Sequence, residues 1–397
     1  MTRTLARLAL LIAAACGAGA GTVGEPAAGE VAGKMASLRA AYSGPPASWP
    51  RPWLDPGIAF VELDAPAPLP PPPPSEADLG ARLFGDPRLS ADGRVSCASC
   101  HDPAHGFSVA DQVGRGVGGM PGRRNPPALH GLDARGSLDW DGGGPALPAR
   151  LLAPLTDPKE MGAGALQGSM EAPECSKILI GESLLPDRIC QPTGNRPGSL
   201  DDAMARLAGT GPGAELARLS GDLAPGTLAR VLAAYLATID GETRFDRFIR
   251  GDATALDDTE LNGLHLFRTK ARCANCHFGP QLSDGRFHNL RLSFFGEPAQ
   301  DLGRYEVTGA REDAGRFRTA SLRHVGDSAP YMHNGLFPTL AGVVNFYDRG
   351  GGEVWARNAA EASRPLYREA AQLSAHIRPL GLSPQEKAAL VAFLGTL

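Results

Sequence analysis

The sequence predicts a mainly helical protein made of two related halves. Two short segments share a pattern of two cysteines, two intervening residues and a closing histidine, "CASCH" at 97–101 and "CANCH" at 273–277. Each follows a helical segment that ends in Gly-x-x-Leu-Phe, at 80–84 and at 263–267. Strand-like alternation is scarce, whereas 50 glycines and 35 prolines in 397 residues predict many loops. A pattern repeated in this way indicates a duplicated structural unit.

The repeated CxxCH motif predicts a covalently bound haem in each half. Its thiols form thioether bonds to the haem vinyl groups, and its histidine becomes an axial ligand of the iron. A zinc site would need more ligands nearby, and a thioredoxin-like pair would need a βαβ context that the sequence lacks. We therefore predict an all-α fold of two cytochrome c-like domains, each with one covalent c-type haem, long loops and little strand. The attachment residues are Cys97, Cys100, His101, Cys273, Cys276 and His277.

Residues 1–20 predict export. Arg3 and Arg7 precede an apolar run, and the small residues that end at Ala20 fit a signal-peptide cleavage site. Cys16 leaves lipid anchoring open as an alternative. No other stretch is apolar for 18 residues, so no transmembrane segment is expected. Because bacteria attach haem thioethers outside the cytoplasm, we expect a periplasmic protein.

Composition divides the rest of the chain into three parts. Residues 21–74 are rich in alanine, glycine and proline and predict an extended spacer, with order beginning at Ser75. Residues 75–252 form the expected first haem domain, which closes with a helical segment over 228–252. Residues 253–397 form the expected second haem domain.

Local signals predict where individual helices begin. Ser75 is the expected N-cap of a helix that ends at Phe84, with Asp78 three residues further on. In the C-terminal helix, Ser383 is the expected N-cap and Glu386 completes a capping box.

The net charge gives no indication of nucleic-acid binding, and the remaining cysteines predict a disulfide. The net charge is −4 and the isoelectric point is about 6.2, and no basic stretch indicates nucleic-acid binding. Cys175 and Cys190 are the pair left after the haem cysteines and Cys16. In an oxidising compartment such a pair is expected to form a disulfide.

Beyond its haem motifs, the sequence resembles the bacterial di-haem cytochrome c peroxidases and their relatives of the MauG type. The resemblance runs from about Ser75 to the C-terminus and rests on "RRNPP", "LDWDGG", "PLTDPKEMG", "FRTASLRHV", "APYMHNG" and "VVNFYDRGG". It implies that the first haem reacts with peroxide and that the second transfers electrons. His101 and His277 are then the proximal ligands.

The resemblance also implies a peroxide pocket at the first haem. Glu160 matches the carboxylate that moves a proton between the two peroxide oxygens, and Pro154 fits the register of the pocket. Trp140 stands where the family places a tryptophan between the haems, with a plain core aromatic as the alternative. Arg150 replaces the usual glutamine, and it either polarises peroxide or turns outward.

The first haem is expected to have an open sixth position. Peroxidases of this family often hold a displaceable histidine in the loop after the first CxxCH, but residues 106–127 contain none. His105 and His130 are the nearest histidines outside that loop. We expect His105 to pack within its own loop, because it is too close to His101 to swing across the haem.

The second haem has two candidate distal ligands. Tyr347 lies fourteen residues after His333, where MauG-like proteins carry a tyrosine ligand. Met332 is the alternative, in which case Tyr347 is a core residue of an amphipathic helix.

Further residues match other sites of the family. Asn125, Ser328 and Pro330 correspond to positions that bind a calcium ion between the domains, and oxygen ligands of this kind suit calcium. Arg318 and Arg323 are candidates for pairing with haem propionates, with surface arginine as the alternative.

The expected function is that of a hydrogen-peroxide-dependent oxidoreductase. In the peroxidase version a small cytochrome c or a cupredoxin supplies electrons. In the MauG-like version an aromatic residue of a protein substrate is oxidised across Trp140, and Tyr347 together with the missing distal histidine favours this version. The alternative is a non-enzymatic di-haem electron carrier with both haems six-coordinate.

Overall fold

The computed structural model describes residues 28–68, 70–132, 139–162 and 199–397, and the backbone of four short strands between 175 and 190. Within these parts the chain is mainly helical with little strand, as predicted. None of their helices is both long and apolar enough to cross a membrane. The expected signal peptide and Cys16 lie outside the described residues.

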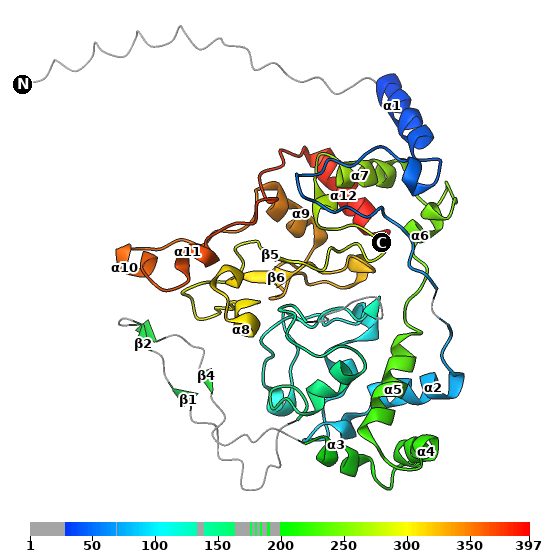
Figure 1. Ribbon diagram of the computed structural model, residues 1–397, viewed down its shortest axis with the longest axis vertical. Coiled ribbons are helices and arrows are strands. Elements are labelled where there is room, and N and C mark those ends of the chain that lie inside the picture. Colours follow the sequence, from blue (N-terminus) through cyan, green and yellow to red (C-terminus); the bar gives the residue numbers. More distant parts are fainter. Residues whose placement is uncertain are drawn as a thin grey trace, which may run out of the picture.

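The helices fall into an N-terminal helix and two groups (Figure 1). The N-terminal helix is α1 (Ala28–Ala41), and the first group is α2 (Pro74–Phe84), α3 (Leu200–Leu207), α4 (Gly211–Ser220) and α5 (Pro225–Leu236). The second group is α6 (Arg244–Ile249), α7 (Asp258–Arg268), α8 (Tyr305–Thr308), α9 (Leu340–Asp348), α10 (Ala359–Ala362), α11 (Tyr367–Ala370) and α12 (Pro384–Leu394). Long loops join them.

The described strands form three short antiparallel pairs. They are β1 (Cys175–Ser176) with β4 (Ile189–Cys190), β2 (Leu179–Ile180) with β3 (Ser183–Leu184), and β5 (Phe287–Asn289) with β6 (Arg316–Arg318). Cys175 lies opposite Cys190 in the first pair. Their side chains lie outside the described residues, so the disulfide stays a prediction.

The first core forms where α2 packs on α5. Leu79 and Leu83, one helical turn apart, are buried on one face of α2. Leu228, Val231 and Leu232 recur at helical spacing on α5 and belong to the same core. The amphipathic stripe of each helix therefore covers the stripe of the other.

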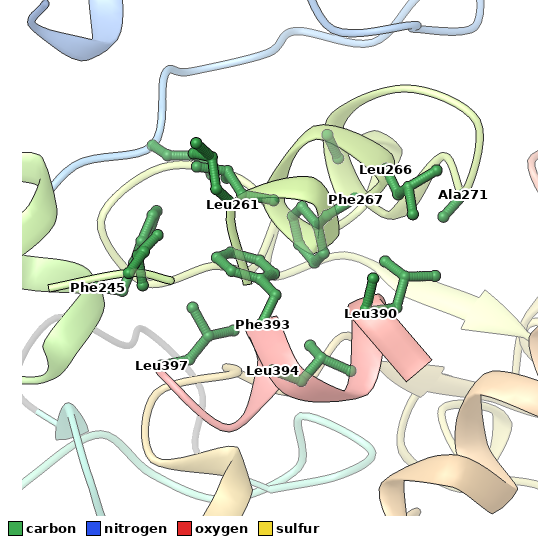
Figure 2. Packing of buried hydrophobic residues seen from close by; sticks show 14 of the residues in the cluster. Phe245, Leu261, Leu266, Phe267, Ala271, Leu390, Phe393, Leu394 and Leu397 are labelled. Carbon is green, nitrogen blue, oxygen red and sulfur yellow. The ribbon is translucent and has the colours of Figure 1, made fainter. Parts of the chain in front are cut away.

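The second core repeats this arrangement with α7 and α12 (Figure 2). Leu261 and Phe267 of α7 face Leu390 and Phe393 of α12, and all four are buried. The rings of Phe267 and Phe393 meet edge to face at 5.4 Å between centroids, a favoured aromatic geometry.

The shared Gly-x-x-Leu-Phe pattern has a packing reason in both cores. A Cβ atom on Gly80 would lie 2.0 Å from the Val231 carbonyl oxygen of α5, and one on Gly263 would lie 2.1 Å from the Ala389 oxygen of α12. Real side chains cannot occupy such positions, so each glycine lets two helices approach closely. The repeat seen in the sequence is thus a repeat of helix packing.

The segment before Ser75 differs from the expected spacer. It contains helix α1, and Leu38, Tyr42, Trp49 and Leu63 are buried in the second core. The prediction that order begins at Ser75 is therefore wrong. Alanine, glycine and proline dominate the average composition, but scattered large apolar residues supply enough buried surface to fix the segment.

A buried arginine ties this segment to α7. Arg268 is fully buried, is ion-paired with Glu62, donates to the Pro50 carbonyl at 2.9 Å and lies over the Trp49 ring at 5.4 Å. Because an unpaired buried charge is costly, removal of Glu62 would leave the Arg268 guanidinium without its partner and destabilise the fold. We call residues 28–64 the N-terminal strap.

Two other predicted boundaries shift. Helix α2 begins at Pro74, and Ser75 does not cap it, because proline suits the first helical position and precedes the serine. The segment 228–252 is two helices, and Phe245 and Phe248 of the second lie in the second core rather than closing the first. The Ser383–Glu386 capping box of α12 is confirmed.

The two halves meet along polar loops. Arg124 is ion-paired with Asp141 of its own half, and at 2.7 Å with Asp301 of the other. The Asn125 backbone N–H donates to the His333 carbonyl at 2.7 Å. These contacts join the loop around Arg124 in the first half to the loops around Asp301 and His333 in the second.

Candidate active site

Each CxxCH motif lines a cavity of its own. The first cavity is bordered by Cys97, Cys100, His101, Arg150, Pro154 and Glu160. The second is bordered by Cys273, Cys276, His277, Met332 and Tyr347. The sequence-predicted residues therefore gather around two centres.

A short turn places the cysteines and histidine of each motif on one side. The motifs begin as 3-10 turns, Cys97–Ser99 and Cys273–Asn275. In both, the histidine backbone N–H donates to the carbonyl of the first cysteine at 2.9 Å. A tight turn of this kind brings both thiols and the imidazole to the same cavity wall.

The two proximal histidines are oriented in the same way. His101 Nδ1 lies 3.1 Å from the Phe107 carbonyl, and His277 Nδ1 lies 2.8 Å from the Leu282 carbonyl. A carbonyl oxygen only accepts, so Nδ1 carries the proton and Nε2 keeps its lone pair. Burial lowers the pKa of both imidazoles, that of His101 to about 4, which keeps them neutral. A neutral imidazole fixed through Nδ1 is the form that ligates a metal.

These features fit a haem in each cavity. Two thiols and an oriented imidazole nitrogen share one wall, and apolar side chains such as Leu132, Leu232 and Leu236 border the first cavity. Burial raises the pKa of the Cys97 and Cys273 thiols to about 12, as expected beside an apolar site. When bound, each haem would be held through Cys97, Cys100 and His101, or through Cys273, Cys276 and His277.

Glu160 supplies a carboxylate to the first cavity. Burial raises its pKa, repulsion from Asp157 adds to this rise, and the charge of Arg150 opposes it. Glu160 borders the first cavity and, although surrounded by protein atoms, keeps an exposed surface. A carboxyl group with a raised pKa is suited to accepting and returning a proton.

Arg150 turns toward an acidic partner that sequence reasoning missed. Its Nε lies 2.7 Å from Oδ1 of Asp139, and both residues border the first cavity. The Asp139 carbonyl also accepts from Arg318 Nε at 3.1 Å. Asp139 belongs to the "LDWDGG" motif, which marks it as a candidate, but the spacing in the sequence does not predict that it pairs with Arg150.

Trp140 borders both cavities. Its indole Nε1 donates to the Asn125 carbonyl at 2.8 Å, and its own carbonyl accepts from the Arg318 N–H at 2.7 Å. The ring meets His333 edge to face at 6.4 Å. The side chain is thus fixed between the two cavities.

Helix α9 carries Tyr347 into the second cavity. Leu340, Val343, Val344 and Tyr347 border this cavity at the i, i+3, i+4 and i+7 positions of one helix face. Burial raises the pKa of the Tyr347 phenol. Among the described residues its hydroxyl has no hydrogen-bond partner, whereas that of Tyr331 on the same cavity donates to Val325 O at 3.0 Å.

Met332 borders the same cavity from the opposite loop. It has a left-handed backbone with φ of 71°, unusual for a residue with a side chain. The structure thus brings both candidate distal ligands to the second centre.

The other predicted residues are distributed as follows. Asn125, Ser328 and Pro330 border one cavity at the interface. Arg318 and Arg323 are buried on that cavity, and Arg323 is ion-paired with Asp246. No sequence pattern predicted Asp246 as the partner of Arg323.

His105 and His130 do not border the first cavity. His105 pairs with Asp102 at 2.7 Å within its own turn, as expected. Among the described residues that border the first cavity, the one histidine is His101. Within the described part of the chain, no second histidine borders this cavity.

Comparisons with known proteins agree with this geometry. A family model for di-haem cytochrome c peroxidase matches residues 74–254. The chain is 32% identical over 349 residues to cytochrome-c peroxidase IdrP1 of Pseudomonas sp. (strain SCT), covering 80% of this chain and 79% of that protein. It is 33% identical over 328 residues to the methylamine utilization protein MauG of Methylorubrum extorquens, covering 80% and 77%.

A solved structure shares the fold. The diheme peroxidase BthA from Burkholderia thailandensis E264 superposes with a TM-score of 0.61 at 25% identity, covering 88% of this chain and 93% of that chain. The fold and the paired cavities thus define the class, a mainly helical protein with two haem sites. The chain belongs to the di-haem cytochrome c peroxidase family. It is a peroxide-dependent oxidoreductase rather than a non-enzymatic electron carrier.

Proposed function

We propose that this protein is a MauG-like di-haem enzyme of the periplasm. Each cavity holds one covalent c-type haem, and the two cores mark two haem domains. The observation that carries the proposal is Tyr347, whose hydroxyl reaches the second cavity without a protein partner. Tyrosine is a known haem ligand, and its oxygen stabilises oxidised iron more than a thioether does.

The first domain supplies the peroxide pocket. When bound, haem provides the redox-active iron at which peroxide reacts. Glu160 takes the proton from one peroxide oxygen and returns it to the departing one through its carboxylate oxygens. Arg150 is ion-paired with Asp139 at 2.7 Å, borders the first cavity and would polarise a peroxide oxygen there. Pro154 shapes the pocket and offers no side-chain hydrogen bond.

Trp140 connects the two centres. The indole is held at both its Nε1 and its backbone carbonyl, so it keeps one orientation between the cavities. A rigid aromatic ring in this place is suited to carrying charge between them. The protein substrate in this proposal is one with an oxidisable aromatic side chain.

Met332 supports a second candidate function. If its thioether is the distal ligand, the second haem suits the peroxidase version, in which a small cytochrome c or cupredoxin donates electrons. In that version Tyr347 only fills the cavity wall.

A calcium ion is part of the proposal. Asn125, Ser328 and Pro330 would hold it at the interface, because they offer amide and carbonyl oxygens. Asn125 also fixes the position of Trp140 through its carbonyl.

The test compares two tyrosines on one cavity. Tyr347→Phe should change the absorption spectrum and raise the potential of the second haem, while Tyr331→Phe should leave both near wild type. Haem content and the first-haem spectrum serve as folding controls. An unchanged second-haem spectrum in Tyr347→Phe, together with a changed one in Met332→Leu, would select the peroxidase version instead.

A further inference from the structure

Three metal-ligand side chains meet at the junction of the two halves, outside both haem cavities. His130 comes from the first half, Asp240 from the linker between α5 and α6, and His324 from the second half. One ligand atom from each lies within 4.8 Å of the others. Neither the haem chemistry nor the calcium positions use these side chains.

The contacts among the three show an organised cluster. His130 Nδ1 lies 3.3 Å from Asp240 Oδ1, and the His130 and His324 rings stack at 4.0 Å between centroids with 28° between planes. The Gly131 backbone N–H donates to both Asp240 oxygens, at 2.8 and 2.9 Å. This second contact orients the carboxylate, as outer partners of metal ligands do.

His324 adopts a backbone conformation that is unfavourable for its residue type. Its φ of 55° is left-handed, and its N–H donates to the carbonyl of the C-terminal Leu397 at 2.8 Å. Such strain persists only where the surroundings enforce it, and it occurs often at ligand sites. Here the conformation directs the ring toward His130.

We propose that His130, Asp240 and His324 form a binding site for a divalent transition-metal ion of the zinc type. Two imidazoles and one carboxylate are a ligand set that zinc accepts, with a fourth position open to water. Imidazoles disfavour calcium, which prefers oxygen ligands, so this site is distinct from the interdomain calcium candidate.

Small side-chain rotations suffice to close the site. Tetrahedral zinc bonds of about 2.0–2.1 Å place ligand atoms about 3.3 Å apart, so atoms within 4.8 Å of one another have little distance to cover. His130 is nearly buried, whereas the Asp240 side chain is about one-third exposed and leaves an entry path. The ion would clamp the two halves together, because His324 belongs to one and His130 to the other.

The experiment uses the full-length, haem-loaded protein, stripped of loosely bound metal by a chelator. Zinc chloride is titrated by calorimetry in excess calcium chloride, so that oxygen-ligand sites are filled. We expect one equivalent of zinc to bind and the thermal unfolding temperature to rise with zinc. His130→Asn, Asp240→Asn and His324→Asn should each weaken zinc binding at least about 10-fold.

Two matched controls keep the result specific. His105→Asn removes a histidine that pairs with a single aspartate, so its zinc affinity should equal that of wild type. His288→Asn removes a member of the other described cluster, Cys276, Asp284 and His288, and should also bind zinc normally. Haem spectra and zinc-free unfolding temperatures near wild type establish that each variant folds; Asp240→Asn changes shape least.

Defined outcomes overturn the proposal. Wild-type protein that takes up no zinc in excess calcium contradicts it. So do cluster variants that fold and retain wild-type affinity, and so does loss of the bound zinc in His288→Asn or His105→Asn.

Discussion

The two halves build the same proximal side of a haem site from different sequences. In each, a 3-10 turn places the cysteines, and a backbone carbonyl orients the histidine through Nδ1. The carbonyl belongs to a non-glycine residue with positive φ in both cases, Phe107 at 56° and Leu282 at 49°. Both halves therefore share a strained turn after the CxxCH motif, and the motif itself does not predict it.

The opposite sides of the cavities differ in chemistry. The first cavity presents a carboxylate and a guanidinium, whereas the second presents a phenol and a thioether. A carboxylate is suited to proton transfer, whereas a phenol or a thioether is suited to ligating iron and setting its reduction potential. The two cavities therefore share one proximal frame and differ in the side chains opposite it.

The cores differ in their support as well. The N-terminal strap packs on the second core, and none of its side chains that the structure describes is buried in the first. The second half is therefore built from chain segments far apart in sequence, and the first is more local.

The largest expected effect comes from removing the carboxylate that distinguishes the first cavity from the second. Glu160→Gln removes the proton acceptor but keeps the shape, so the reaction with peroxide should slow by about 10²- to 10⁴-fold, the usual contribution of such a group. Stopped-flow absorption measures the rate, and haem content should not change. Asp157→Asn is the matched control, since Asp157 raises the pKa of Glu160 but does not itself border the first cavity. Wild-type kinetics in Glu160→Gln would remove this residue from the mechanism.

The next effect tests the strap. Trp49 is 5% exposed in the second core, and Trp49→Ala should cost about 3–5 kcal/mol of free energy of unfolding. Hydrogen exchange should show the loss in α7 and α12 but not in α2 and α5. Trp53→Ala is the control, because Trp53 is 56% exposed and its truncation should change little. Equal losses in both halves would contradict an independent second core.

A smaller effect tests the shared helix packing. Gly80→Ala and Gly263→Ala should each destabilise their half by about 1–3 kcal/mol, because the new methyl group would overlap a backbone carbonyl. Gly226→Ala in α5 meets no atom within 4 Å and should be neutral or stabilise by up to about 1 kcal/mol. Denaturant unfolding compares the three variants. Equal free energies of unfolding for Gly80→Ala and Gly226→Ala would contradict a close helix contact at Gly80.

The smallest effect concerns pH. Burial and Asp157 raise the pKa of Glu160, and its proton-accepting form is the carboxylate. The rate of reaction with peroxide should therefore rise with pH through a pKa above the ordinary value of about 4.3. Asp157→Asn should move this limb to lower pH and Arg150→Gln to higher pH, each by up to about one unit. Asp222→Asn, a remote exposed change, should leave it in place, and shifts of the opposite sign would exclude the assignment to Glu160.

The sequence by itself determined the centres and much of the frame. Both CxxCH motifs were readable, because haem attachment fixes residue types at a fixed spacing. Glu160 and Tyr347 were predicted from the family resemblance, and the structure places them on the first and the second cavity. The capping box at Ser383 was readable too, since it depends on residues three apart.

Tertiary structure alone decided which distant residues share a site. The Asp139 partner of Arg150, the burial of Trp49 and the meeting of His130 with His324 join residues 11 to about 200 positions apart. Local patterns hold no information on such pairs, because contact is set by how the helices cross and how the loops close. The same reason applies to the Gly-x-x-Leu-Phe repeat. The sequence shows the repeat, but only the structure shows its cause, which is the close approach of a second helix to each glycine.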